Sequence, residues 1–173
     1  PCNPSGTVYT KPELDALAKV VASHPDLYVI SDEIYEHINF SGTFCSIASI
    51  PGMFDRTITV NGVAKAFAMT GYRIGYIGAP EFIAKACTKI QGQVTSGANS
   101  VAQRATITAV DADPSVLNHM VQAFHSRRDL VVGLLKEIPG VKINVPEGAF
   151  YVFPDVSSFF GKTLRGTEIK DAN

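Results

Sequence analysis

The sequence predicts an α/β fold in which helices alternate with short buried strands. Thr10 and Glu13 form a capping box, and apolar residues at helical spacing predict a helix of about three turns from residue 11. An apolar run at 27–30 predicts the first strand, and a similar run at 57–60 predicts the second. The stretch between these runs is long enough to return the chain parallel, so we expect the two strands to be neighbours.

A third strand is predicted at 73–78, with the opposite direction. The gap between Lys65 and Ile74 is shorter than the dozen or so residues that a parallel crossover needs. If this strand joins the sheet, it therefore runs antiparallel to its neighbour.

The second half of the chain is predicted to be mainly helical before a smaller unit begins. Helices at 81–91 and 100–110 precede a long helix that opens at Asp113-Pro114-Ser115 and stops at Pro139-Gly140. Residues 141–145 and 149–153 then predict two strands joined by a turn. We therefore divide the chain into a first domain at 1–112, a connecting helix at 113–138 and an incomplete smaller domain at 139–173.

Composition and charge exclude several classes of protein. The 15 basic and 16 acidic residues give a net charge of -1, so no basic surface for nucleic acid is expected. Charged residues interrupt the apolar runs before the roughly 18 residues of a membrane span. The 3 cysteines and 4 histidines form no cluster, which predicts reduced thiols and no metal site. We expect a cytoplasmic protein that binds small molecules, present here as a piece of a longer chain.

Lys65 lies in an unusual setting for a lysine. It is the only charged residue among the sixteen that separate Arg56 from Arg73. An isolated lysine of this kind usually extends into solvent from the start of a helix. Removal from water disfavours the ammonium form, however, and leaves more neutral amine to attack a carbonyl.

Other polar residues are predicted to lie near Lys65. Asp32 follows the first strand and Asn61 follows the second, and parallel strands end at the edge where α/β sheets bind ligands. Tyr35 is three residues after Asp32, so both project toward that edge if a helical turn begins there. Arg73 is a planar donor suited to a phosphate. Each signal alone also fits a helix cap or a surface ion pair, and only their combination indicates a site.

Three segments of the chain together resemble the class I/II aminotransferases of fold type I. They are Asn3-Pro4-Ser5-Gly6, Ser31-Asp32-Glu33-Ile34-Tyr35 and the segment 64–75. Residues 64–71 read Ala-Lys-Ala-Phe-Ala-Met-Thr-Gly, as in bacterial aspartate aminotransferases, and 146–151 is similar to the small domain of the same group. The resemblance implies that the first domain is part of a large mixed α/β/α sheet domain and that 139–173 begins a small α+β domain.

The resemblance also implies pyridoxal 5'-phosphate as the cofactor and indicates the residues that hold it. Lys65 is implied as the catalytic residue, which forms a Schiff base with the cofactor and then transfers a proton. Asp32 is implied as the partner of the pyridine nitrogen, and Asn3 and Tyr35 as donors to the phenolic oxygen of the ring. Arg73 is implied as the phosphate ligand.

The chain departs from the family pattern in two respects. Many family members carry hydroxyl residues just before the lysine, one of which contacts the phosphate, whereas residues 62–64 are Gly-Val-Ala. The family's other phosphate-binding loop, ring-stacking aromatic residue and carboxylate-binding arginine have no counterpart in these residues. We therefore expect the isolated 173 residues to be inactive.

For the whole protein, the resemblance implies a homodimer that transfers an amino group from an amino acid, aspartate in the first place, to a 2-oxo acid. Two alternatives remain open. One is a pyridoxal-phosphate-dependent β-lyase that cleaves a C–S bond, because the cofactor residues do not distinguish elimination from transamination. The other is a non-catalytic fragment that retains only the fold.

Overall fold

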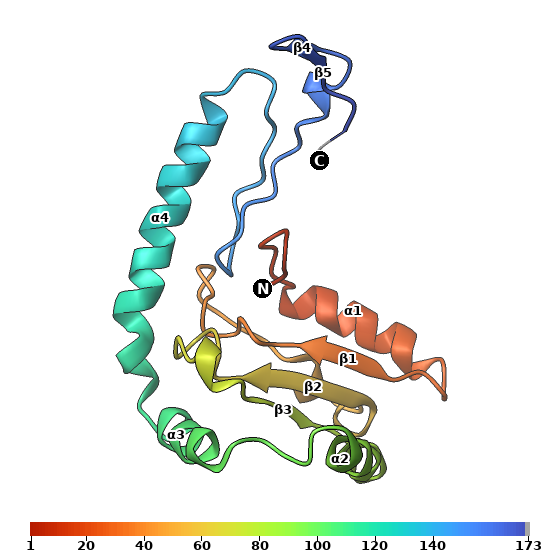
Figure 1. The fold of residues 1–173 in the computed structure, drawn as a ribbon. Coiled ribbons are helices and arrows are strands. Elements are labelled where there is room, and N and C mark those ends of the chain that lie inside the picture. Colours follow the sequence, from red (N-terminus) through yellow and green to blue (C-terminus); the bar gives the residue numbers. More distant parts are fainter. Residues whose placement is uncertain (172–173) are drawn as a thin grey trace. The chain divides into compact units, whose positions relative to one another are not determined.

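The computed structural model describes residues 1–171, and the chain divides into two units. One unit comprises Tyr9–His37 and Gly42–Asn118 and contains the sheet and three helices. The other comprises Pro1–Val8, Ile38–Ser41 and the chain from His119 onward. Figure 1 shows the helices and strands along the chain. The predicted α/β fold is confirmed. The domain boundaries at 112 and 138 stay a prediction, and residues 172 and 173 of the predicted third segment, 139–173, lie outside the described residues.

A three-stranded mixed sheet forms the centre of the first unit (Figure 1). β1 (Val29–Asp32) and β2 (Thr57–Gly62) run parallel, and Asp32 pairs with Val60. β3 (Gly75–Gly78) runs antiparallel to β2, and Gly75 lies opposite Gly62. Both predicted directions are confirmed, although β1 begins two residues later than the apolar run indicated.

Helix α1 (Lys11–Ala22) supplies the apolar core of this unit. The Glu13 carboxylate accepts hydrogen bonds of 2.7 Å from both the backbone N–H and the hydroxyl of Thr10, which fixes the start of the helix. The buried face of α1 packs against the short helix η1 (Ile47–Ser49) and the residues that follow it. The core cluster consists of Leu14, Ala18, Val21, Ile47, Ile50 and Met53.

The predicted burial of the first strand is wrong for one face. Ile30 is 75% exposed, whereas Val29 packs against the core cluster. Successive side chains of a strand point to opposite faces, so a core on one face leaves every second residue of β1 in solvent. The two following helices, α2 (Glu81–Val94) and α3 (Ser100–Val110), confirm the predicted segments, and α2 has no buried residue.

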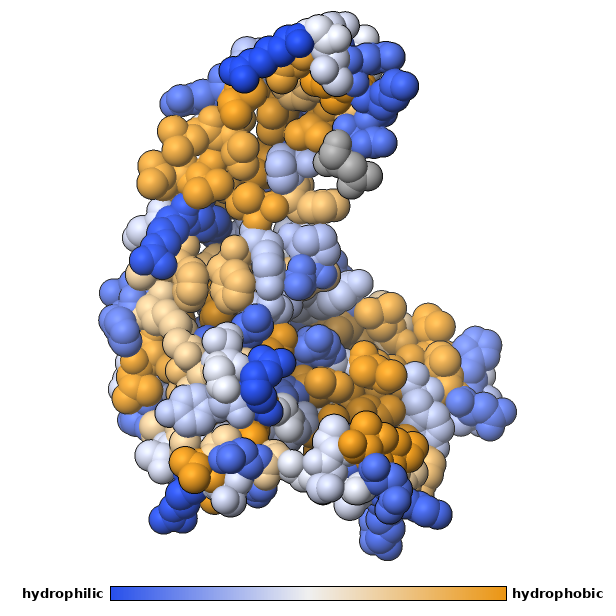
Figure 2. Space-filling view, in the orientation of Figure 1, coloured by the Kyte–Doolittle hydropathy of each residue, from blue (hydrophilic) through white to orange (hydrophobic). Residues whose placement is uncertain are grey.

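The second unit contains all but the first residue of α4 (Asn118–Lys136), the long helix expected from the sequence. The short helix η4 (Pro114–Leu117) precedes it and belongs to the first unit. Phe124 on α4 stacks with Phe150 at 5.2 Å between ring centroids. Figure 2 shows apolar residues along the later turns of α4, where Leu130 and Leu134 are more than half exposed. Among residues 1–171, no helix is long and apolar enough to cross a membrane.

The predicted strand-turn-strand at 141–153 is wrong. Within it the chain forms only single bridges, between Lys142 and Asp155 and between Asn39 and Gly148. Backbone groups that would join the two strands bond elsewhere in the same unit, because Ala149 donates to Ile38 O at 2.7 Å and the 147–148 amides donate to Gly6 O. Two strands of two residues, β4 (Thr163–Leu164) and β5 (Thr167–Glu168), form a hairpin further along.

Candidate functional site

The sheet register brings three chain segments to one edge of the first unit. β1 and β2 are parallel, so the segments that follow Asp32 and Gly62 leave the sheet on the same side. β3 is antiparallel, so the segment that precedes Gly75 approaches that side as well. Four of the five predicted site residues lie on these segments: Asp32, Tyr35, Lys65 and Arg73. Ligand sites of α/β sheets form at this edge.

Lys65 lies in a tight turn between β2 and the short helix η3 (Thr70–Tyr72). Ala68 donates its N–H to Lys65 O at 3.2 Å, and Met69 donates to Val63 O at 3.4 Å, which closes the turn. Val63 and Ala66 are buried, so the lysine backbone is anchored on apolar residues while Lys65 itself is half-buried. The turn therefore holds an amine at a fixed place on the sheet edge.

Asp32 and Tyr35 lie on the turn that follows β1. Asp32 is exposed, and its Oδ1 accepts the Ile34 N–H at 3.2 Å. Tyr35 is 5% exposed. No helix follows the strand, because Glu36 donates its N–H to Glu33 O in a turn at 34–37. The alternative interpretation of residues 31–33 as a helix cap is therefore wrong.

Arg73 ends helix η3 in a left-handed backbone conformation, with φ of 56°. Its Nη1 donates to Thr70 O at 3.0 Å, and the side chain is exposed. The guanidinium has further N–H donors beyond this bond, as an anion ligand requires. Arg73 thus adds a positive charge to the segments that carry Lys65 and Asp32.

Asn3, the fifth predicted residue, belongs to the second unit. It is exposed in a turn closed by the Cys2 N–H, which donates to Thr7 O at 3.0 Å, and by the Gly6 N–H, which donates to Cys2 O at 2.8 Å. The peptide bond between Asn3 and Pro4 is cis. The structure places this residue with its own unit, while Asp32, Tyr35, Lys65 and Arg73 lie on the segments at the sheet edge of the first unit.

The sequence reasoning missed two acidic residues beside Asp32 and Tyr35. Glu33 is 6% exposed, and its Oε1 accepts hydrogen bonds from Ser31 Oγ at 2.9 Å and Ser46 Oγ at 2.6 Å. The Glu36 Oε1 accepts a hydrogen bond of 2.7 Å from Asn61 Nδ2. No signal in the sequence marked these two acids, because the burial of Glu33 and the partner of Glu36 appear only when the chain folds.

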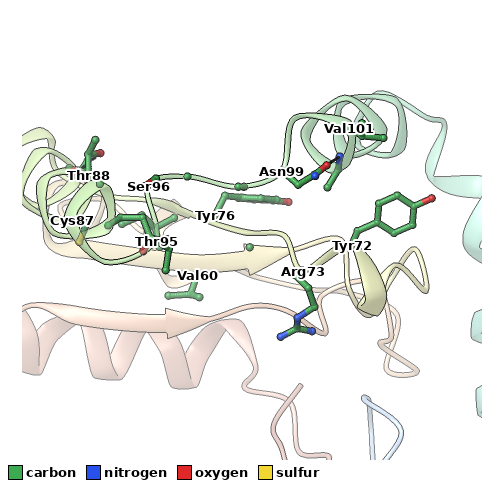
Figure 3. A pocket seen from close by; sticks show the side chains of 18 of the residues that line it. Val60, Tyr72, Arg73, Tyr76, Cys87, Thr88, Thr95, Ser96, Asn99 and Val101 are labelled. Carbon is green, nitrogen blue, oxygen red and sulfur yellow. Dashed lines mark hydrogen bonds between the residues drawn. The ribbon is translucent and has the colours of Figure 1, made fainter.

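A cavity of about 1370 Å³ lies between β2, β3 and helices α2 and α3. Figure 3 shows its polar lining from Thr95, Ser96 and Asn99, with Tyr76 facing this segment from the strand. Burial raises the pKa of the Tyr76 phenol, and the Glu36 carboxylate raises it further. Arg73 lines the cavity but Lys65, Asp32 and Tyr35 do not, so the four groups do not converge in this space.

The donor set at the sheet edge fits a small aromatic aldehyde that carries a phosphate. An amine can bond to the aldehyde carbon, a carboxylate can pair with a protonated ring nitrogen, a phenol can donate to a ring oxygen and a guanidinium can bind phosphate. Within residues 1–171, no group of three or more His, Cys, Asp or Glu side chains could hold a metal ion. The fold is α/β, and the four side chains on this sheet edge are of the types that hold a pyridoxal-type cofactor.

Comparison with known proteins identifies the family. Residues 1–165 match the family described as aminotransferase class I and II, and the chain belongs to that family, whose members depend on pyridoxal phosphate. The chain is 52% identical over 170 residues to the bifunctional aspartate aminotransferase and glutamate/aspartate-prephenate aminotransferase of Petunia hybrida. It is 49% identical to the aspartate aminotransferase of Pinus pinaster.

The structural comparison agrees with the sequence comparison. The crystal structure of the aspartate aminotransferase from Rhizobium meliloti matches with a TM-score of 0.93 and 42% identity over 98% of the chain. The fold is therefore that of the fold type I aminotransferases over part of their length. The chain spans 36% of the Petunia protein and 43% of the Rhizobium chain.

Proposed function

We propose that these residues belong to a pyridoxal-phosphate-dependent aminotransferase that transfers an amino group from an amino acid, aspartate in the first place, to a 2-oxo acid. One observation carries the proposal: the register of β1, β2 and β3 directs the segments with Asp32, Lys65 and Arg73 to one sheet edge. The names of the relatives support aspartate as the donor. The homodimer implied by the sequence belongs to the same proposal.

Each residue has a distinct task in this proposal. When bound, the cofactor supplies an electron sink for the charge that develops at the substrate α-carbon. Lys65 Nζ would hold the cofactor through its aldehyde carbon and then carry the proton to and from that α-carbon. The Asp32 carboxylate would keep the ring nitrogen protonated, and a charge pair at about 4 Å and an effective dielectric near 20 contributes about 4 kcal/mol.

The remaining donors would orient the cofactor. Tyr35 and Asn3 would donate to the phenolic oxygen of the ring, and Arg73 would bind the phosphate. Residues 62–64 carry no hydroxyl, so the charge of Arg73 would account for a larger share of the phosphate affinity. Removal of that charge is therefore expected to weaken cofactor binding more than it slows the chemistry.

The test is borohydride reduction of the cofactor-loaded full-length protein, followed by peptide mapping. The reduced cofactor is expected on Lys65, and the label is expected to disappear in Lys65→Arg. Lys85, whose ammonium pairs with Glu81 at 2.6 Å on exposed α2, provides a matched control, and Lys85→Arg should leave the label unchanged. A label on another lysine contradicts the proposal.

Product analysis separates transamination from the β-lyase alternative. With aspartate and 2-oxoglutarate, the proposal expects oxaloacetate and glutamate in equal amounts. Pyruvate and ammonia released from a sulfur amino acid without a 2-oxo acid acceptor would instead assign the protein to the lyases. No feature of the described residues favours elimination.

A further inference from the structure

We infer that Glu36 is a positioning residue that holds the turn carrying Lys65 against the turn carrying Asp32 and Tyr35. This inference rests on the proposed function for the role of Lys65, but the contacts that carry it are independent of the cofactor. Glu36 is 29% exposed and lies on the turn after β1, one residue beyond Tyr35. Its carboxylate contacts Asn61 at the end of β2 and the neighbouring His37.

The first contact orients the Asn61 amide. Asn61 Nδ2 donates to Glu36 Oε1 at 2.7 Å, while Asn61 Oδ1 accepts the Gly62 N–H at 2.7 Å. A carboxylate is only an acceptor, so it selects the amide orientation that presents NH2 to Glu36 and oxygen to Gly62. Rotation of the amide by half a turn would place two donors against each other at Gly62. Glu36 therefore keeps a hydrogen-bond acceptor at the start of the Lys65 turn.

The second set of contacts involves Phe67, which follows Lys65 in the chain. His37 Nε2 lies 3.5 Å from the same Glu36 Oε1, and its ring meets the Phe67 ring edge-on with centroids 6.1 Å apart. Asn61 precedes Lys65 and Phe67 follows it, so Glu36 and His37 contact the turn on both sides of the lysine. The charge of Glu36 also raises the pKa of Tyr76 on β3. One carboxylate thus acts on all the segments that meet at this edge.

The arrangement predicts a specific pattern of rescue. Glu36→Ala removes the acceptor, and Asn61→Asp places two carboxylates within hydrogen-bond distance. The double variant Glu36→Gln with Asn61→Asp reverses the donor and the acceptor, since the glutamine NH2 can donate to a carboxylate that still accepts the Gly62 N–H. An effect that depends on the negative charge at position 36 would not be restored by this exchange, whereas an orienting hydrogen bond would be.

The experiment is hydrogen-exchange mass spectrometry of residues 61–69 in the full-length protein, with and without pyridoxal phosphate. Glu36→Ala and Asn61→Asp are each expected to accelerate exchange about tenfold, as the loss of a charge-assisted hydrogen bond implies. The double variant should return to within about threefold of the unmodified protein. Glu13→Ala, which removes an acid of the same type from α1, should leave residues 61–69 unchanged.

A second readout is the dissociation constant of pyridoxal phosphate, which should rise and fall with the exchange rate across the same variants. Unchanged exchange in both single variants, or a double variant as fast as the single ones, overturns the inference. If borohydride does not label Lys65 in the unmodified protein, the proposed function fails instead. The exchange data without cofactor then still decide whether Glu36 holds the turn.

Discussion

Gly62 is the position at which one methyl group should disturb the candidate site most directly. A Cβ at Gly62 would lie 2.8 Å from Ile74 O, 3.2 Å from Gly75 Cα and 3.3 Å from Ile34 Cδ1. Optimal carbon contacts are about 3.5 to 4.0 Å, so the alanine methyl would push two backbone segments and one side chain apart. Ile34 precedes Tyr35 and Ile74 follows Arg73, so the displacement would reach both predicted cofactor ligands.

The expected change in the free energy of unfolding is the sum of two opposing effects. Overpacking of this kind costs about 1 to 3 kcal/mol. Replacement of glycine by alanine restricts the unfolded chain and gives back about 0.4 to 1 kcal/mol. Gly78→Ala in β3 is a matched control, because a Cβ there meets nothing within 4 Å and only the second effect applies. Gly62→Ala should therefore be less stable than Gly78→Ala by about 2 kcal/mol.

Urea denaturation of both variants in the full-length protein without cofactor measures this difference, with slopes compared to confirm a common unfolded state. The dissociation constant of pyridoxal phosphate is measured beside it and should rise in Gly62→Ala alone. Equal stability of the two variants would show that β2 and β3 are not as close at Gly62 as the register requires. The packing argument for this edge would then be refuted.

Three further outcomes are expected. The Arg56 guanidinium donates hydrogen bonds to Val21 O at 2.9 Å, Pro25 O at 2.6 Å and His24 O. Arg56→Met should therefore lower the free energy of unfolding by about 2 kcal/mol, measured by urea denaturation. An unchanged urea midpoint would contradict this expectation. The hydrogen bonds from the Thr10 hydroxyl and N–H lower the pKa of the Glu13 carboxyl group. The contribution of these bonds to the stability of the folded protein is therefore complete above the usual glutamate pKa, and it is lost as pH falls through the lowered pKa. The unfolding midpoints of the unmodified protein and of Glu13→Gln should therefore converge in acid. A difference between the two midpoints that does not change with pH would contradict the proposed contribution of the Glu13 carboxylate to the helix cap. Residues 1–173 alone should show no transaminase turnover, since they span about two fifths of their relatives, and ordinary turnover would overturn this expectation.

Much of the fold was predictable from interactions between residues that are close together in the chain. The capping box at Thr10 and Glu13 marked the start of α1, and the short gap between Lys65 and Ile74 fixed the antiparallel direction of β3. The strand-turn-strand at 141–153 was not predictable in the same way. Its apolar alternation matches a hairpin, but its amides bond to Gly6 and Ile38, which are distant in sequence.

The residues of the candidate site likewise divide into those that the sequence indicated and those that only the structure brought to notice. Lys65, Asp32, Tyr35 and Arg73 were proposed because an amine in an apolar run and polar groups after strands are local features, and their roles followed from the resemblance to the family. Glu36 was not evident, since an acid among other acids carries no sign of its partner. Its proposed role depends on its contact with Asn61 and on the contact of His37 with Phe67, which only the return of the chain brings about.

The sequence by itself determined the helix starts and the strand directions, because each depends on residues close together in the chain, and it supplied the residues that are proposed to hold a cofactor. Tertiary structure decided which side of β1 is covered, where the amides of 147–149 find acceptors and which carboxylate orients Asn61. These outcomes depend on contacts between segments 25 to more than 100 residues apart. Such contacts form only when each unit folds as a whole, so no local pattern encodes them.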